Sequence, residues 1–270
     1  METLHINPMT LDLSWQDPED NLSRIASQIK MRLKKNSDIK PNEQLFLFPE
    51  LTLTGFVTET PASYAVEPPH AHISALRAIA KEHNTAIAAG FPEANPDDEN
   101  RPFNTMLLIG ADGEVVARYR KMHLFTWGEN SEDKCYSAGN EGVTAVYRGW
   151  KIGFGTCFDI RFPRLFHGYA SESVDLLLVS ACWIGGPHKT YQFKTINSSH
   201  AILSQAYVAA VNRCGRDPFF HYDGGEYVFS PFGEDLYAKV PCKLDPAELE
   251  GARKLVVRPS DRDDYPVRAV

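Results

Sequence analysis

The chain has 270 residues, of which 43% are hydrophobic and 23% charged, so it can bury the large core of a globular protein. The formal net charge is −7 and the isoelectric point lies near 5.7, which excludes the basic surface that nucleic-acid-binding proteins usually carry. Because α/β chains of this length often form one domain, we expect a single domain over residues 1–270 with a polar tail from about Leu255.

The first half of the chain alternates between strand and helix patterns. Residues 4–13 contain a strand pattern, and Asp17 or Asp20 can cap a helix that ends near Lys35. A second helix is predicted at residues 71–83. Further strands are predicted at residues 44–48, 85–91, 103–109 and 114–119, and a polar loop is predicted at residues 92–102.

The second half of the chain continues this alternation and adds hairpins. Strands at residues 143–147 and 150–154 form one hairpin, and residues 227–230 and 236–240 are predicted to form another. Between the two hairpins, the patterns predict a strand at 174–180, a helix at 188–205 and a strand at 207–211, and Asp245 can cap a short final helix. This succession predicts an α/β fold with mixed sheets.

Three segments place a reactive side chain directly after a predicted strand. They are FPELTLTGF with Glu50, YRKMHLF with Lys121 and GTCFDIRFP with Cys157. Reactive groups gather at strand ends in α/β sheets, and a thiol at a sharp strand-to-helix turn is presented to the solvent side of the sheet. A carboxylate, an ammonium group and a thiol can serve as general base, oxyanion stabiliser and nucleophile. Taken singly, each residue is more often structural.

The three segments resemble the signature segments of the nitrilase superfamily of carbon–nitrogen hydrolases, and the chain is most similar to bacterial omega-amidases within it. The similarity runs through nearly the whole chain and includes QAYVAAVNRCG at residues 205–215 and SPFGE at residues 230–234. The resemblance implies a four-layer α-β-β-α sandwich with two mixed sheets, usually paired as a homodimer. It implies no cofactor.

The resemblance also implies a role for each reactive residue. Glu50 takes the thiol proton, Cys157 attacks the amide carbonyl, and ammonia leaves behind a thioester that water then hydrolyses. Lys121 and the backbone N–H of Phe158 stabilise the oxyanion.

The family further implies a second glutamate between the lysine and the cysteine, and Glu129 and Glu132 are the two candidates. Glu132 has the better spacing to the Ala138-Gly139 step, so we expect Glu132 to orient Lys121 or to assist proton transfer. An ordinary loop acid is the alternative interpretation for either glutamate.

Residues near the thiol are candidates for substrate binding. Arg161 either pairs with Asp159 and locks the turn or meets a substrate carboxylate; Lys189 is a second candidate cation. Trp183 follows the strand at 174–180 and is expected to form a wall of the pocket. Cys182 stands where many relatives carry asparagine before this tryptophan.

The sequence does not favour a metal site or a disulfide framework. The five cysteines are widely spaced and contain no CxxC pair, which argues against a disulfide framework or a structural zinc site. His70 and His72 lie two residues apart on a predicted helix and therefore do not share a face. We expect no metal and no cofactor.

The opening residues METLHINPMT lack a basic segment that leads into an apolar one, so no signal peptide is expected. The longest apolar stretch, near residues 174–184, is too short to span a bilayer. A cytoplasmic protein that contacts neither membrane nor nucleic acid is the resulting expectation.

These features predict an amidohydrolase that acts on a small linear amide, such as the terminal amide of 2-oxoglutaramate. An N-carbamoyl amine hydrolase is the alternative within the same class, because the same residues can serve both reactions. A catalytically silent binding subunit and a redox thiol protein are the alternatives from other classes.

Overall fold

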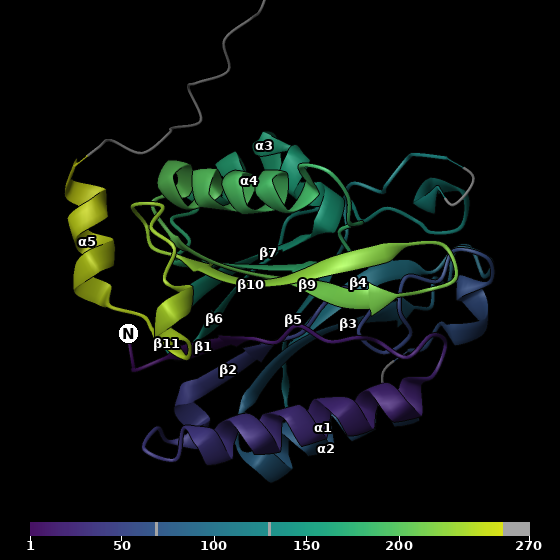
Figure 1. Cartoon of the computed structure of the whole chain (residues 1–270), viewed down its shortest axis with the longest axis horizontal. Coiled ribbons are helices and arrows are strands. Elements are labelled where there is room, and N and C mark those ends of the chain that lie inside the picture. The colour runs from purple at the N-terminus through teal and green to yellow at the C-terminus, as the bar shows by residue number, and fades with distance from the viewer. Residues whose placement is uncertain (68–69, 129–130, 256–270) are drawn as a thin grey trace, which may run out of the picture.

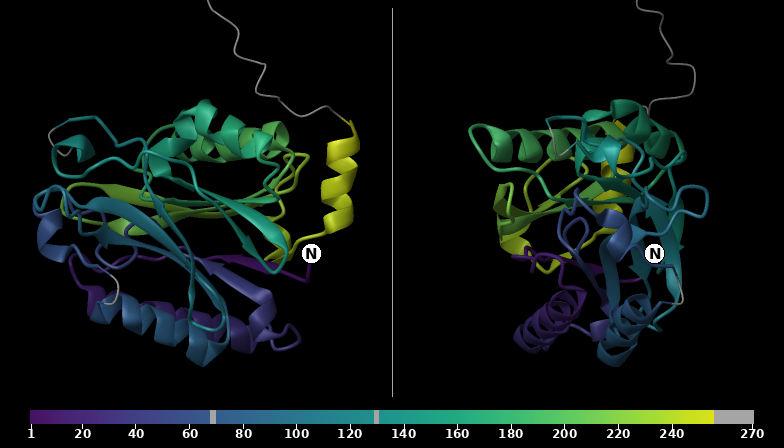
Figure 2. Two further views of the ribbon diagram at one scale, coloured as in Figure 1. Left: turned by 180° about the vertical axis from the view of Figure 1, so that it is seen from behind. Right: turned by 90° about the vertical axis from the view of Figure 1, so that its right-hand side faces the viewer.

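The computed structural model describes residues 1–67, 70–128 and 131–255. Two β-sheets pack face to face, and helices cover the outer face of each sheet (Figure 1). The end-on view in Figure 2 shows the same order of layers, helix–sheet–sheet–helix. The predicted four-layer α-β-β-α sandwich with two mixed sheets is therefore confirmed.

The first sheet has the strand order β11-β1-β2-β3-β4-β5. Its strands are β1 (His5–Pro8), β2 (Gln44–Leu47), β3 (Ala86–Glu93), β4 (Phe103–Ile109), β5 (Val115–Arg120) and β11 (Cys242–Lys243). Strands β1, β2 and β3 are parallel, whereas β4, β5 and β11 pair antiparallel with their neighbours.

The second sheet has the order β10-β9-β8-β7-β6 and repeats this arrangement. Its strands are β6 (Thr144–Tyr147), β7 (Trp150–Thr156), β8 (Leu176–Ala181), β9 (Tyr207–Arg216) and β10 (His221–Phe229). Strands β7, β8 and β9 are parallel in the centre, and an antiparallel strand closes each side.

Five α-helices and five short 3₁₀ turns join the strands within the described residues. The α-helices are α1 (Pro18–Lys35), α2 (Ala71–His83), α3 (Pro163–Ser171), α4 (Lys189–Ser204) and α5 (Pro246–Leu255). The 3₁₀ turns are η1 (Pro41–Glu43), η2 (Pro61–Tyr64), η3 (Glu132–Lys134), η4 (Cys157–Arg161) and η5 (Tyr237–Lys239). Helix α1 begins as predicted, because the Asp17 carboxylate accepts a hydrogen bond from the backbone N–H of Asp20.

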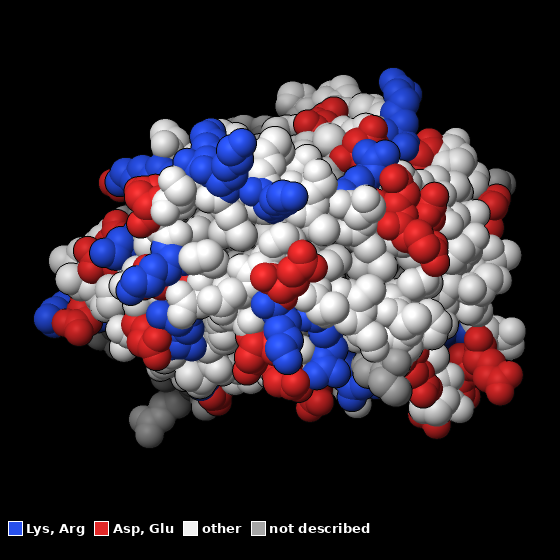
Figure 3. Space-filling model, turned by 90° about the horizontal axis from the view of Figure 1, so that it is seen from below, with Lys and Arg blue, Asp and Glu red and all other residues white. Residues whose placement is uncertain are grey.

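Helices α1 and α2 lie side by side on the first sheet, and α3 and α4 lie together on the second (Figure 1). The face below α1 and α2 shows Lys and Arg side chains interspersed with Asp and Glu side chains (Figure 3). Of the helices that the structure describes, none combines the length and the apolar character that crossing a bilayer requires.

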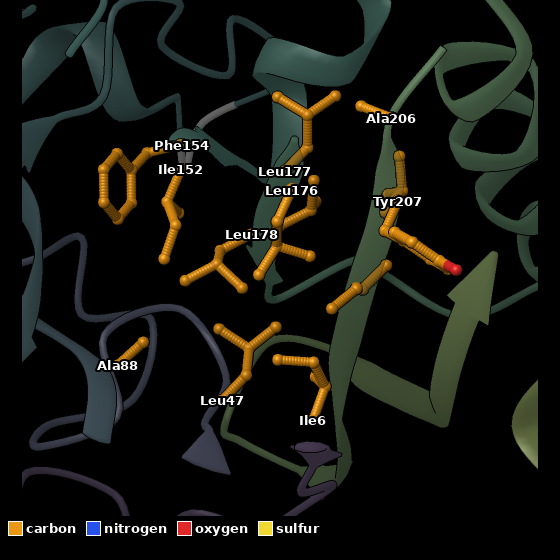
Figure 4. Packing of buried hydrophobic residues seen from close by; sticks show 14 of the residues in the cluster. Ile6, Leu47, Ala88, Ile152, Phe154, Leu176, Leu177, Leu178, Ala206 and Tyr207 are labelled. Atoms are coloured by element: carbon orange, nitrogen blue, oxygen red, sulfur yellow. The ribbon is translucent and has the colours of Figure 1, made fainter. Parts of the chain in front are cut away.

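Strand β2 shows how the alternation of side chains builds the layers. Leu45 and Leu47 face the second sheet, whereas Phe46 packs on the other side, in the cluster that contains residues of α1 and α2. Figure 4 shows the inter-sheet contact, with Ile6 and Leu47 from the first sheet opposite Leu178 from the second. This dry apolar core holds the two sheets at a fixed spacing.

The predicted final hairpin is present only as a single antiparallel bridge, between Phe229 and Asp235. Strand β10 pairs with β9 along its length, and most of the segment 236–240 forms the turn η5 instead of a strand. Gly224 and Gly225 both have positive φ in β10, and these glycines interrupt the alternating pattern by which a strand is recognised in sequence. The polar loop predicted at 92–102 also begins late, because β3 continues to Glu93.

Candidate active site

Glu50 is the third residue after the end of β2, in a tight turn against β3. Leu51 follows it with a φ of 46°, so the chain reverses at once and keeps the carboxylate at the strand end. A Cβ atom added at Gly90 of β3 would lie 2.5 Å from the Leu51 nitrogen, so only glycine permits this approach. The Glu50 side chain is completely buried.

Lys121 is the first residue after β5 and is held at both backbone groups. Its N–H donates to the Asn104 carbonyl at 2.8 Å, and its carbonyl accepts from the Gly139 N–H at 2.8 Å. The side chain is also completely buried. A lysine without solvent contact needs a paired anion, because burial of an isolated ammonium group is costly.

Cys157 is the first residue after β7 and begins the turn η4. Its φ of 46° is rare for a residue with a side chain and produces the predicted sharp turn. The Asp159 carboxylate stabilises this turn by accepting from the backbone N–H of Thr156 and of His123, both at 2.9 Å. Cys157 lines a pocket and is 8% exposed.

Asp159 does not pair with Arg161, so the first of the two interpretations of Arg161 is wrong. The second oxygen of Asp159 accepts from the Tyr119 hydroxyl at 2.7 Å. Arg161 instead donates to the Gln192 side-chain oxygen at 2.7 Å, and its guanidinium carbon lies 4.7 Å from the centre of the Trp183 ring. The arginine is therefore free of carboxylate partners among the described contacts, and it lines the pocket.

Glu132 completes a buried charged cluster with Glu50 and Lys121. The Lys121 ammonium donates to Glu50 at 2.8 Å and to Glu132 at 2.6 Å. All three side chains have zero exposure. The alternative candidate, Glu129, lies outside the described residues.

Three further donors bind the carboxylates, and the sequence analysis gave none of them this role. The backbone N–H of Phe125 donates to Oε2 of Glu132 at 2.9 Å. The Asn104 side-chain amide donates to both Glu50 and Glu132 at 2.8 Å. The backbone N–H of Cys182 donates to the other oxygen of Glu50 at 2.7 Å. A lone asparagine at the second position of a strand carries no motif, so only its cross-strand position beside Lys121 could have indicated its role.

The cluster contains two carboxylates and one ammonium group, and this excess of negative charge governs its protonation. Burial opposes the charge of Lys121, but the carboxylates of Glu132 and Glu50 outweigh burial and raise the lysine pKa well above its ordinary value. Burial, reinforced by the charge of Glu50, raises the pKa of Glu132 despite the opposing effect of Lys121. Burial and the nearby Glu50 also raise the pKa of the Cys157 thiol.

One pocket brings the thiol and the ammonium group together with the predicted binding residues. Its volume is about 40 Å³, and its lining includes Cys157, Lys121, Phe158, Arg161, Trp183 and Lys189. The ammonium group of Lys189 lies 6.0 Å from the Trp183 ring, on which Arg161 also packs. The pocket is thus small, with the thiol and two cationic side chains among its lining groups.

The two histidines considered for metal binding lie elsewhere. His72 binds Glu19 at 2.9 Å on the outer helical layer, and its ring packs against that of His70. Within residues 1–67, 70–128 and 131–255, no group of three or more His, Cys, Asp or Glu side chains is arranged to hold a metal ion.

Comparisons with known proteins agree with this geometry. The model of the carbon-nitrogen hydrolase family matches residues 6–241. The 2-oxoglutaramate amidase of Bacillus subtilis is 28% identical over 231 residues, which cover 86% of this chain and 84% of that protein. Omega-amidase YafV of Yersinia enterocolitica is 28% identical over 267 residues, which cover 98% of this chain and 96% of that protein.

A solved structure gives the same result. XC1258 from Xanthomonas campestris, a CN-hydrolase superfamily protein, superposes with a TM-score of 0.81 at 25% identity and covers 94% of this chain and 95% of that chain. The matched residues 6–241 contain every residue of the pocket and of the charged cluster described above.

Proposed function

The chain belongs to the carbon–nitrogen hydrolase family, whose members act on carbon–nitrogen bonds other than peptide bonds, and we propose that it is an amidase for the terminal amide of a short dicarboxylic acid monoamide. A substrate such as 2-oxoglutaramate has an amide at one end and a carboxylate at the other. The observation that carries the proposal is one pocket that Cys157, Lys121, Arg161 and Lys189 line together.

The first step is proton transfer from the thiol. Because burial raises the pKa of Cys157, the resting group is a protonated thiol and needs a base before it can attack. Glu50 is the proposed base, since its charge acts on the thiol and its carboxylate is held by Lys121, Asn104 and Cys182. The thiolate sulfur attacks the amide carbonyl carbon and forms a tetrahedral oxyanion.

The second step stabilises that oxyanion. Lys121 keeps its proton because two carboxylates face it, so it presents a fixed positive charge to the pocket. The backbone N–H of Phe158, the residue after the nucleophile, is the proposed second donor. Such preorganised donors commonly contribute about 10²- to 10³-fold each to the rate.

The remaining steps release the products. The proton held by Glu50 passes to the leaving nitrogen, the carbon–nitrogen bond breaks, and ammonia departs from a thioester on Cys157. Water then gives its proton to Glu50 and attacks the thioester carbonyl. The acid product leaves, and the proton returns to the thiol.

Arg161 and Lys189 are the proposed partners of the substrate's distant carboxylate. Arg161 has no carboxylate partner among the described contacts, and it packs on Trp183 where both line the pocket. The guanidinium group can bind a carboxylate through two parallel hydrogen bonds. Trp183 and Phe158 would flank the aliphatic segment between the two ends of the substrate.

Ammonia release tests the proposal. Purified protein is mixed with 2-oxoglutaramate, glutaramate and neutral pentanamide, and ammonia is measured beside a Cys157→Ala variant. We expect wild-type turnover that is fastest on the two carboxylates, and no turnover above background in the variant. Equal ammonia from both proteins would contradict the proposal.

The same assay separates the two cations. Arg161→Gln should lower kcat/KM for glutaramate by about 10- to 100-fold, because a charge-assisted hydrogen bond is lost, and should change pentanamide little. Lys189→Gln is the matched variant on the other side of Trp183. If both substrates lose activity equally in both variants, the carboxylate is bound elsewhere.

Two alternatives are tested by the same panel. An N-carbamoyl amine hydrolase would release ammonia from carbamoyl compounds and leave the amides intact. A silent binding subunit would release none from any compound. The filled positions of Glu50, Lys121 and Cys157 argue against a silent subunit.

We also propose that the chain is one cytoplasmic domain that forms a homodimer. Helix α4 exposes Tyr191, Ile202 and Leu203 by 70%, 52% and 61%, which is unusual for apolar side chains of this size. The cysteines are all unpaired, as expected in a reducing compartment. Light scattering should give twice the mass of the chain, and Leu203→Glu should shift it toward the monomer.

A further inference from the structure

Asn104 of β4 lies between the two carboxylates of the charged cluster. Its side-chain nitrogen donates to Oε1 of Glu50 and to Oε1 of Glu132, both at 2.8 Å. An amide nitrogen carries two hydrogens, so each carboxylate receives one of them. Asn104 is only 1% exposed, and its amide nitrogen therefore depends on these two acceptors.

The orientation of this amide is fixed by its neighbours. If the side chain were turned over, its oxygen would face two carboxylate oxygens, and three acceptors would meet without a hydrogen between them. The Asn104 backbone also binds the cluster, because its carbonyl accepts from the Lys121 N–H at 2.8 Å. One residue thus contacts all three charged members.

Other titratable groups that face the carboxylates do not replace this contact. Tyr136 and the thiols of Cys135, Cys157 and Cys182 all have pKa values raised by burial and by nearby negative charge, so they remain neutral near pH 7. Lys121 is the cation that faces Glu50 and Glu132 within the described residues. Its single charge leaves one of two buried negative charges uncompensated.

We infer that Asn104 is a positioning residue whose amide favours the charged form of both carboxylates and turns Glu50 toward the thiol. The inference rests on the proposed function of Glu50 as the base. A hydrogen-bond donor favours the charged form of a carboxylate, and two donors from one rigid amide favour both charged forms at once. Asn104 touches neither substrate nor sulfur in this role.

The contacts of Glu50 show what this positioning achieves. Its Oε1 accepts from both Lys121 and Asn104, whereas its Oε2 accepts from the backbone N–H of Cys182. Oε2 therefore accepts fewer of the described hydrogen bonds than Oε1, so Oε2 is the oxygen available to receive a proton. Without Asn104, the carboxylate could rotate and bring either oxygen against the lysine.

The pH profile of kcat/KM tests the inference through the variant Asn104→Leu. This change keeps the side-chain volume and removes both donors, so the carboxylates become harder to ionise. We expect the acid limb to move up by about one to two pH units, with a loss of about 10- to 100-fold at pH 6. The matched control is Asn7→Leu, because Asn7 is also a buried strand asparagine but donates to Gln44, away from the cluster.

A second variant keeps the inference testable if Asn104→Leu does not fold. Asn104→Ser retains one short donor that can reach at most one carboxylate, so its acid limb should lie between those of the wild type and Asn104→Leu. Circular dichroism and thermal unfolding identify which variants are folded. A folded variant with the acid limb of the wild type would overturn the inference.

The rate at which acrylamide labels Cys157 gives the same profile without any substrate. Peptide mapping by mass spectrometry separates this label from those on the other cysteines. If wild-type protein releases no ammonia from any amide, the proposed function fails. The acid limb of the labelling rate still reports on the role of Asn104 in that case. If the labelling limb is unchanged in every folded Asn104 variant, the inference fails whatever the ammonia assay shows.

Discussion

Two clusters of charged residues flank the antiparallel strands β4 and β5. Each contains buried charge, but the two clusters compensate that charge in different ways. The first, here termed the Lys121 cluster, consists of Lys121, Glu50, Glu132 and Asn104. The second, here termed the Glu93 cluster, consists of Glu93, Arg118, Arg120 and Thr105. Glu93 is nearly as buried as the members of the first, with its side chain 3% exposed.

The Glu93 cluster has surplus positive charge that reaches solvent. Glu93 accepts from Arg118 at 2.9 Å and from Arg120 at 2.7 and 3.1 Å, and these arginine side chains are 49% and 34% exposed. Thr105 adds a hydrogen bond at 2.7 Å. Water can solvate both guanidinium groups, and the buried carboxylate is paired with both of them.

The Lys121 cluster has surplus negative charge and no exposed side chain among its charged members. A buried charge that is not fully compensated tends to take up a proton, which is the property that proton transfer in a reaction requires. The comparison therefore indicates that similar ion pairs on neighbouring strands serve stability in one place and chemistry in the other.

Replacing Lys121 with methionine should have the largest effect. Methionine keeps the length of the side chain but leaves two buried carboxylates without a cation. We expect activity to fall by at least about 10³-fold, because the oxyanion loses its charged donor. The free energy of unfolding should fall by about 3–5 kcal/mol, because a buried pair has lost one partner.

Ammonia release and urea unfolding measure these two effects. Lys40→Met is the matched control, since the Lys40 side chain is 77% exposed and bridges to Glu43 only at the surface. Retained activity in a folded Lys121→Met protein would show that the cluster is structural, like the one at Glu93.

The glutamates of the two clusters should respond in opposite ways to the same change, Glu→Gln. Glu132→Gln should lower activity by about 10²-fold or more, the usual contribution of a group that assists proton transfer. The free energy of unfolding of Glu132→Gln should change little, because two effects oppose each other. The neutral amide removes surplus negative charge, but it also places one N–H group against another hydrogen-bond donor. Glu93→Gln should leave activity within about twofold and lower the free energy of unfolding by about 1–2 kcal/mol, because charged hydrogen bonds are lost.

Stability measured against pH sharpens this contrast. Burial raises the pKa of Glu132 in the folded protein above its ordinary value of 4.5. A raised carboxyl pKa means that the stability it contributes is present below about pH 4.5 and is lost as pH rises through the folded-state value. The wild type should therefore lose stability relative to Glu132→Gln as pH rises above 4.5. A constant difference across that range would contradict the assignment of surplus charge.

The sequence predicted the three charged members of the Lys121 cluster and missed the Glu93 cluster for physical reasons. Glu50, Lys121 and Cys157 each come at the end of a segment with a strand pattern, and these segments resemble the family's signature segments, so the two signals together indicated one site. Glu93 fell within a predicted polar loop, because Pro92 and the polar residues after it mask the end of β3. Burial of such a residue depends on Arg118 and Arg120 from another strand, which local patterns do not contain.

Much of the fold followed from local patterns as well. Helix α2 and strand β4 have their predicted bounds, since their apolar spacing and flanking turns agree. The contacts that hold the reactive groups in place could not be predicted from local sequence patterns. The backbone N–H of Cys182 reaches Glu50 across the two sheets, and the side chain of residue 182 gives no sign of it.

Within the Glu93 cluster, the two arginines should contribute unequally, and this is the smallest effect that we predict. Arg118→Met should lower the free energy of unfolding by only about 0.2–1 kcal/mol, because half of its side chain is in solvent. Arg120 binds both carboxylate oxygens, and its guanidinium carbon lies 3.9 Å from the centre of the Phe103 ring. Arg120→Met should therefore cost more than Arg118→Met.

Salt distinguishes the two arginines further. The Debye length falls to about 3 Å at 1 M salt, so the contribution of the more exposed Arg118 should nearly vanish there. The two-point contact of Arg120 and its packing on Phe103 should persist, because neither depends mainly on long-range attraction. Equal losses of stability in the two variants at low salt and at 1 M salt would mean that net charge alone holds Glu93. The two clusters would then differ only in the sign of their surplus charge, and not in how hydrogen bonds fix their side chains.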